Sequence, residues 1–168
     1  MQPLNQLRQK NTINSCILYA WFHALILNGV INPLDKEHEI KRLRDVVGDY
    51  VVNTWTTTLT AIANHYHCSF QKLTNIWDIG KAFVSWKAIV MSIEQKNLTA
   101  WLKDSLDWQI DDVILSQSSA WTWHAICVVR EGLTAMVYDS LWGRKYKMPN
   151  LFKHITTKQL RNFVYLLK

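Results

Sequence analysis

The stretch NTINSCILYAWFHALILNG, residues 11–29, holds one cysteine followed by an almost continuous apolar run. Asn14 and Ser15 are favourable N-cap residues, and Asn28-Gly29 is a typical end of a helix. Because the apolar side chains fall on nearly every side, the pattern predicts a central, buried helix. Cys16 would lie in its first turn, where the helix dipole and free N–H groups stabilise a thiolate.

Helical patterns come first along the chain, and strand-like patterns follow. Further helices are predicted at about 34–47, 57–66 and 98–106, with a helical turn at 156–162. Strands are predicted at 68–73, 86–93, 111–117, 121–130, 133–139 and 163–167. This order is typical of an α+β fold with an antiparallel sheet. At 168 residues, we expect a single domain, residues 1–168, with a helical part to about residue 66 and a sheet part over about 67–168.

Composition and charge limit the environment and the partners. Three widely spaced cysteines and no signal-peptide pattern favour a reducing, cytoplasmic location, although delivery as an effector or a virion protein would leave no such signal. The apolar run from Ile17 to Leu27 is too short for a membrane span. The net charge is +6, because the residues after Asp139 sum to +7 and the rest of the chain sums to −1. The simpler interpretation of this basic C-terminal face is solvated lysines; the alternative is contact with an acidic partner, and no motif indicates specific nucleic-acid binding.

The stretch AICVVREGLTAMVY, residues 125–138, reads as a hairpin turning at Glu131-Gly132. A two-residue loop there places His124 directly opposite Asp139, along with Val128 opposite Ala135. Cβ atoms of opposed residues lie about 4.5–5.5 Å apart. A carboxylate at one imidazole nitrogen fixes the tautomer and leaves the other nitrogen for a nucleophile. Cys16, His124 and Asp139 together are the parts of a thiol-nucleophile triad.

Each of these residues also has a simpler interpretation. A lone cysteine in an apolar setting is usually buried and inert, and a His–Asp pair on a hairpin is often structural. His23, two turns after Cys16, is expected in the core or at a lobe interface rather than as a catalytic base. His65, His67 and Cys68 lack the spacing of a zinc site, so neither metal nor cofactor is predicted. His154 lies in the basic C-terminal stretch with no evident partner.

The arrangement of Cys16, His124 and Asp139 resembles the papain-like cysteine peptidases, in which the nucleophile opens the central helix and the His lies on the sheet. The segment DSLWG, residues 139–143, is similar to the family's Asn/Asp–Ser–Trp–Gly segment, with one extra residue. The double-glycine-leader peptidases and the Josephin-type deubiquitinases have the most similar patterns. The resemblance implies that Trp142 covers the His–Asp hydrogen bond and that Trp123 and Trp142 line a substrate cleft.

The family places a Gln before the Cys to help form the oxyanion hole. Lys10 stands at the papain-type offset, so the resemblance assigns this role to Asn11 first and Gln9 second, together with the Cys16 N–H group. It implies a thiol hydrolase that cleaves an amide bond in a peptide or protein. Two alternatives remain: a glutamine deamidase, transglutaminase-type effector or peptidoglycan amidase, and a degenerate papain-like domain used for binding or structure.

Overall fold

The computed structural model describes residues 15–32, 34, 36–47, 55–118, 123–139, 144–162 and 164–168. Within these ranges the chain forms an α+β structure. Its helices are α1 (Ser15–Leu27), α2 (Lys36–Val47), α3 (Trp55–Tyr66), α4 (Ile76–Val84), α5 (Gln95–Lys103), α6 (Ile110–Ser118), η4 (a 3-10 helix, Leu151–His154) and α7 (Thr157–Asn162).

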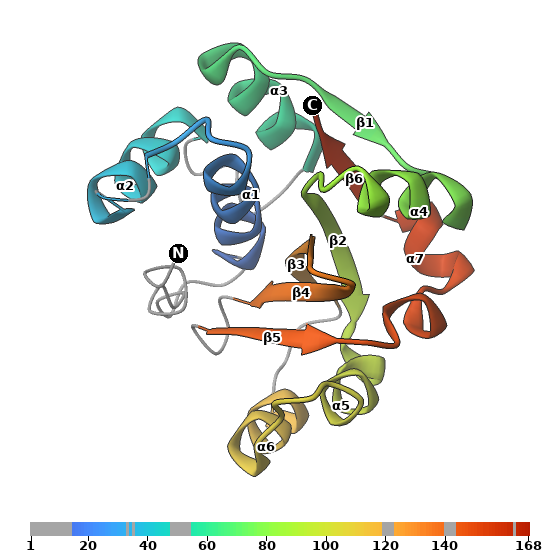
Figure 1. Ribbon diagram of the computed structural model, residues 1–168. Coiled ribbons are helices and arrows are strands. Elements are labelled where there is room, and N and C mark those ends of the chain that lie inside the picture. The colour runs from blue at the N-terminus through green and yellow to red at the C-terminus, as the bar shows by residue number, and fades with distance from the viewer. Residues whose placement is uncertain are drawn as a thin grey trace.

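Six strands form one antiparallel sheet. They are β1 (Phe70–Lys72), β2 (Ile89–Glu94), β3 (Trp123–Glu131), β4 (Thr134–Asp139), β5 (Arg144–Met148) and β6 (Val164–Leu167). Their order across the sheet is β1-β6-β2-β3-β4-β5 (Figure 1). The C-terminal strand β6 is thus inserted between β1 and β2, and β3 lies inside the sheet with a neighbour on each side. The predicted α+β class and antiparallel sheet are confirmed.

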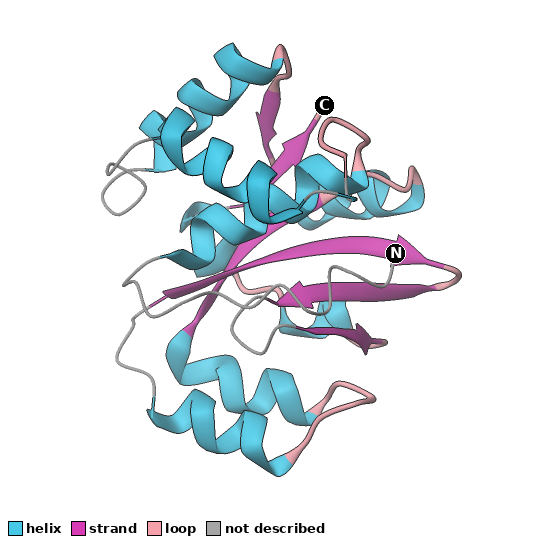
Figure 2. Cartoon of the chain, turned by 90° about the vertical axis from the view of Figure 1, so that its left-hand side faces the viewer, coloured by secondary structure: helices cyan, strands magenta, loops and turns pink. Residues whose placement is uncertain are grey.

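Helices cover both faces of this sheet, because successive strand residues point to opposite sides. One core joins α1, α2 and α3 to the face that carries Ala125 and Cys127 of β3. The second core joins α4 and α5 to the face that carries Ile126 and Val128. In Figure 2 the long strands cross the middle of the view, two shorter strands lie among the helices above, and the pair α5 and α6 lies below. The part from residue 67 onward is therefore not only sheet, since α4 to α7 are interspersed with its strands.

Helix α1 begins and ends close to where the sequence predicts. It starts at Ser15, and at its other end the N–H of Val30 donates to the carbonyl of Leu25 while the N–H of Gly29 donates to that of Ile26. These two bonds form a Schellman motif, with Gly29 at a φ of 74° in the left-handed region. The helix is buried along almost its whole length, as its continuous apolar pattern indicates.

The hairpin β3–β4 forms, but its predicted register is wrong. Its strands end at Glu131 and begin again at Thr134, so that Val128 faces Val137 rather than Ala135. The turn is therefore one residue later than predicted, and each residue of β3 is shifted by two along β4. A shift of two leaves every side chain on its predicted face, whereas a shift of one would have reversed them all.

The main errors of element type concern residues 76–84, 111–117 and 144–148. The sequence predicts a strand at 111–117, yet this segment lies within helix α6. The carboxylate of Asp112 accepts a hydrogen bond from the N–H of Gln109 at 3.1 Å, as in a capping box. Helix α4 and strand β5 were not predicted. No helix among the described residues has the length and apolarity needed to cross a bilayer.

Candidate active site

His124 and Asp139 form a buried pair at the ends of β3 and β4. The His124 Nε2 atom lies 2.7 Å from Asp139 Oδ1, and neither side chain is exposed to solvent. In the observed register Asp139 lies diagonally across from His124, two residues from the position directly opposite. Diagonal neighbours on one face are about 7–8 Å apart at Cα, still within reach of long side chains. The predicted contact thus exists, although the predicted reason for it is wrong.

Cys16 reaches this pair from a different part of the chain. It lies in the first turn of α1 and is 7% exposed. Helix α1 packs on β3 and contacts β4 (Figure 1), which brings its N-terminal turn to His124. The charge of Cys16 acts on the buried His124 ring, so the two side chains lie close together. Because Nε2 is occupied by Asp139, Nδ1 is the ring nitrogen available to the thiol, so the order is Cys16, His124, Asp139.

The site favours a charged imidazole. Burial lowers the pKa of His124, but the charge and hydrogen bond of Asp139, together with the nearby Cys16 side chain, outweigh it and raise this pKa to about 10. An imidazolium at neutral pH is therefore held between a carboxylate and a thiol. Such a neighbour stabilises a thiolate, and a helix N-terminus acts in the same direction.

Two aromatic side chains form a chain of hydrogen bonds that ends at the Asp139 carboxylate. The Tyr146 hydroxyl donates to Asp139 Oδ2 at 3.2 Å, and Trp101 Nε1 donates to the Tyr146 oxygen at 2.8 Å. Both side chains are buried. They come from β5 and α5, so the Asp139 carboxylate is fixed by elements outside its own hairpin.

The sequence prediction missed Tyr146 because it missed β5. A signal for that strand was present. Residues 144–148 read RKYKM, which places Tyr146 and Met148 on one face and Lys145 and Lys147 on the other. Both Tyr146 and Met148 are buried.

The remaining predicted site residues are only partly placed. Three predicted site residues lie outside the described residues: Gln9, Asn11 and Trp142. The structure therefore does not test the oxyanion role of the first two or the cleft role of the third. Trp123 opens β3 opposite Glu94 and is half-buried. The Lys158 ammonium lies 5.8 Å from the centre of the Trp123 ring. The ring therefore contacts α7, while the backbone of Trp123 pairs with β2.

The other histidines and cysteines have different surroundings. His23 is buried beside Tyr138, with ring centres 5.8 Å apart, and burial together with Lys36 lowers its pKa to about 3. It is a core residue, as predicted. Burial raises the pKa of the buried Cys127 thiol and of the half-buried Cys68 thiol. Among the described residues, no group of three or more potential ligands is arranged to hold a metal ion.

One prediction about a histidine is wrong. His154 has a partner, because its Nε2 atom lies 2.7 Å from Asp104 Oδ2. The contact joins η4 to the residue that follows α5, across a separation of 50 residues. No pattern in the sequence indicates such a contact.

Comparisons with models of protein families, with curated proteins and with solved structures found no match to this chain.

Proposed function

We propose that the chain is a thiol hydrolase of the papain-like type, which cleaves an amide bond in a peptide or protein through Cys16. The observation that carries this proposal is the buried sequence of contacts from Cys16 to His124 to Asp139. Three residues from a helix and two strands meet in the order that a thiol nucleophile, a base and an orienting carboxylate require.

Each residue has one role in the proposed reaction. The Cys16 sulfur attacks the carbonyl carbon of the substrate and forms a tetrahedral intermediate. The His124 imidazolium then gives its proton to the leaving amine, and a thioester remains on Cys16. Neutral His124 next takes a proton from water, whose oxygen attacks the thioester and releases the acid. Asp139 holds the ring in place throughout, and the N–H group of Cys16 is one donor available to the oxyanion.

The low exposure of Cys16 makes its reactivity an informative measurement. Cys16 is 7% exposed, whereas Cys68 is half-buried and Cys127 is fully buried. If accessibility alone set the rate, iodoacetamide would modify Cys68 first. If His124 activates the sulfur, Cys16 reacts first. Mass spectrometry of the alkylated protein distinguishes the three sites.

The decisive comparison uses two histidine variants of matched size. His124→Gln removes the imidazole but keeps most of its volume, so that Cys16 does not become more exposed. His154→Gln removes the other histidine that contacts an Asp at 2.7 Å. We expect His124→Gln to slow alkylation of Cys16 at neutral pH about tenfold or more, because an unassisted thiol is mostly protonated there. His154→Gln should leave the rate unchanged.

The proposal fails if Cys16 reacts no faster than Cys68 in the wild type and is indifferent to His124→Gln. The triad would then be a buried structural cluster, which corresponds to a degenerate papain-like domain. If Cys16 is activated, turnover of fluorogenic peptide amides, ubiquitin conjugates and muropeptides tests hydrolysis directly, with Cys16→Ser as the inactive control.

A further inference from the structure

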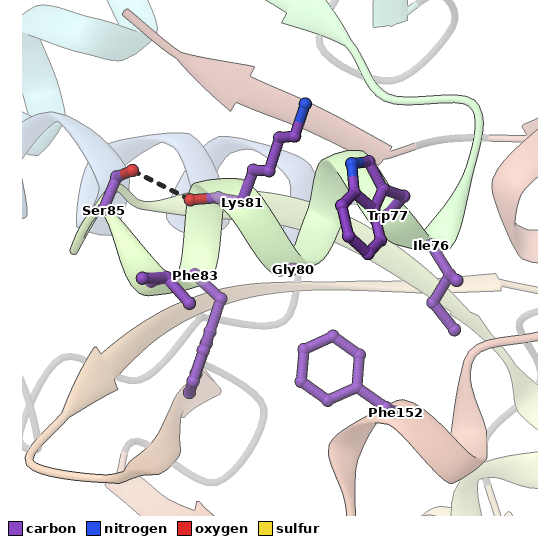
Figure 3. Close-up of a pocket in the computed structure, with 8 residues that line it drawn as sticks. Ile76, Trp77, Gly80, Lys81, Phe83, Ser85 and Phe152 are labelled. Atoms are coloured by element: carbon purple, nitrogen blue, oxygen red, sulfur yellow. Dashed lines mark hydrogen bonds between the residues drawn. The ribbon is translucent and has the colours of Figure 1, made fainter.

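An open apolar groove of about 900 Å³ lies between α4 and η4. Figure 3 shows Ile76, Phe83 and Phe152 around the space between the two helices; Trp77 and Lys81, on the upper side of α4 in this view, also line the groove. The groove is not part of the candidate active site. The carbonyl of Val84 at the end of α4 accepts a hydrogen bond from Arg130, near the turn of the hairpin, whereas His124 lies at the opposite end of β3.

The groove exposes more apolar surface than a folded chain usually leaves uncovered. Trp77 is 71% exposed, Val84 62%, Ile76 46% and Phe152 40%. Trp86, just beyond α4, is 55% exposed. Clusters of this kind on a protein surface commonly mark a site of interaction with another protein or a ligand.

The charges around the groove are positive. Lys81 lies 5.8 Å from the centre of the Trp77 ring, and Arg130 lies 4.4 Å from that of Trp86. Neither cation forms an ion pair with a carboxylate in the described part of the chain. Asp78, on α4, is hydrogen-bonded to Asn75. The groove therefore suits an apolar partner that carries carboxylates.

Helix α6 of the same chain combines exposed apolar side chains with a carboxylate. Ile110 is 63% exposed and Ile114 56%, and they lie one turn apart. Just before the helix, Leu106 and Trp108 are 64% and 42% exposed. Asp111 is exposed beside these isoleucines and has no ion pair within the described ranges. Apolar anchors at helical spacing with acidic neighbours are typical of a helix that binds in a groove.

The face of α6 that carries Ile110 and Ile114 points outward, away from the α4–η4 groove of the same chain. Gln95 Nε2 of α5 donates to the carbonyl of Ser116 at 2.7 Å, and the hydroxyls of Thr99 and Ser116 are 3.1 Å apart. These bonds hold the opposite side of α6 against α5. In Figure 1 the pair α5 and α6 and the helix α4 lie on different sides of the molecule. A contact between α6 and the groove must therefore join two copies.

We propose that this chain self-associates head to tail, with α6 of one copy bound in the α4–η4 groove of a second copy. Ile110 and Ile114 enter the groove, and Asp111 faces Lys81 and Arg130. Because the two surfaces are different, each copy in a pair still has one free groove or one free helix, and assembly continues beyond the dimer. The proposal is independent of the chemistry at Cys16.

Sedimentation velocity of the full chain, from micromolar to millimolar concentration, tests the proposal. We expect the mean mass of the wild type to rise with concentration and to pass that of a dimer. Ile114→Ser removes an anchor from the helix, and Trp77→Ser removes one from the groove, so each variant alone should stay monomeric. Leu34→Ser is the matched control, because Leu34 is 88% exposed but lies before α2; it should associate like the wild type.

A mixture of the two variants gives the sharpest result. The intact groove of Ile114→Ser can bind the intact helix of Trp77→Ser, so the mixture should form dimers and stop there. Lys81→Glu should weaken wild-type association about threefold or more, and Lys81→Glu combined with Asp111→Lys in one chain should restore it. A wild type that stays monomeric at millimolar concentration overturns the proposal, as do association that survives Trp77→Ser and a mixture that stays monomeric.

Discussion

The described part of the molecule contains two His–Asp pairs with the same contact distance and different surroundings. His124 and Asp139 lie 2.7 Å apart with neither side chain exposed, while His154 and Asp104 lie 2.7 Å apart with side chains 23% and 37% exposed. Cys16 adjoins the first pair, whereas the second ties η4 to the end of α5 and has Asn150 as a further partner of Asp104. Distance alone therefore does not distinguish a candidate catalytic pair from a structural contact.

Burial accounts for the difference. Water screens an exposed pair, so its two charges stabilise the fold only slightly. A buried pair is not screened, and removing one partner leaves the other charge or polar group without compensation. The same isolation from water strengthens the effect of His124 on a neighbouring sulfur. Four variants or conditions sharpen this comparison, from the largest expected effect to the smallest.

Asp139→Asn should have the largest effect on stability. It removes the carboxylate that compensates a buried imidazolium, and we expect it to lower the free energy of unfolding by about 3 kcal/mol. It should also slow alkylation of Cys16. Asp104→Asn, the matched change in the exposed pair, should alter both only slightly. Urea unfolding and alkylation rates measure the two effects, and equal losses in the two variants would contradict the contrast.

Alkaline pH should weaken the buried pair. The folded-state pKa of His124 is raised to about 10, above its unfolded value of about 6.5. Its contribution to stability is therefore fully present below pH 6.5 and is lost as the pH rises through about 10. Unfolding free energies measured between neutral pH and pH 10.5 should fall more steeply in the wild type than in Asp139→Asn. Parallel curves would show that His124 is not charged in the folded protein.

Tyr146→Phe tests the support behind Asp139. It removes one hydrogen bond to the carboxylate and leaves Trp101 Nε1 without its acceptor, so we expect a loss of about 1–3 kcal/mol. Cys16 alkylation should slow less than in Asp139→Asn. Tyr66→Phe is the control, because the buried Tyr66 hydroxyl has no hydrogen-bond partner in the described structure; that change should be nearly neutral. If Tyr146→Phe destabilises the fold but leaves Cys16 reactivity unchanged, Tyr146 is structural only.

The exposed pair should show the smallest effect, at acid pH. The hydrogen bond from His154 is the main cause of a lowered Asp104 pKa, with lesser contributions from Asn150 and nearby charges. This contribution is present above the unfolded Asp pKa and is lost as the pH falls through the lowered value. We expect His154→Gln to remove a small, salt-sensitive part of the stability above pH 4, as thermal unfolding at low and high salt would record. A loss as large as that of Asp139→Asn would contradict the screening argument.

The β3–β4 hairpin shows which structural features the local sequence pattern predicts. Alternating residues in 123–139 predict two strands and the face on which each side chain lies, and both predictions are confirmed. The position of the turn was wrong by one residue, since several turns satisfy the same alternation. His124 and Asp139 are nevertheless in contact, because a register shift of two residues leaves each side chain on the same face of the sheet. The predicted strand at 111–117 is a helix, because the capping carboxylate of Asp112 and packing against α5 decide the type of this segment.

The sequence by itself determined the helix that begins near Cys16, the cap at Gly29 and the presence of His124 and Asp139 on one face of a hairpin. Hydrogen bonds and side-chain periodicity within a few residues specify these features. Only the tertiary structure decided that α1 brings Cys16 to His124, that Trp101 and Tyr146 hold Asp139, and that His154 pairs with Asp104. These contacts join elements distant in sequence, and they form only because α1 and α5 pack against a sheet in which β3, β4 and β5 lie side by side.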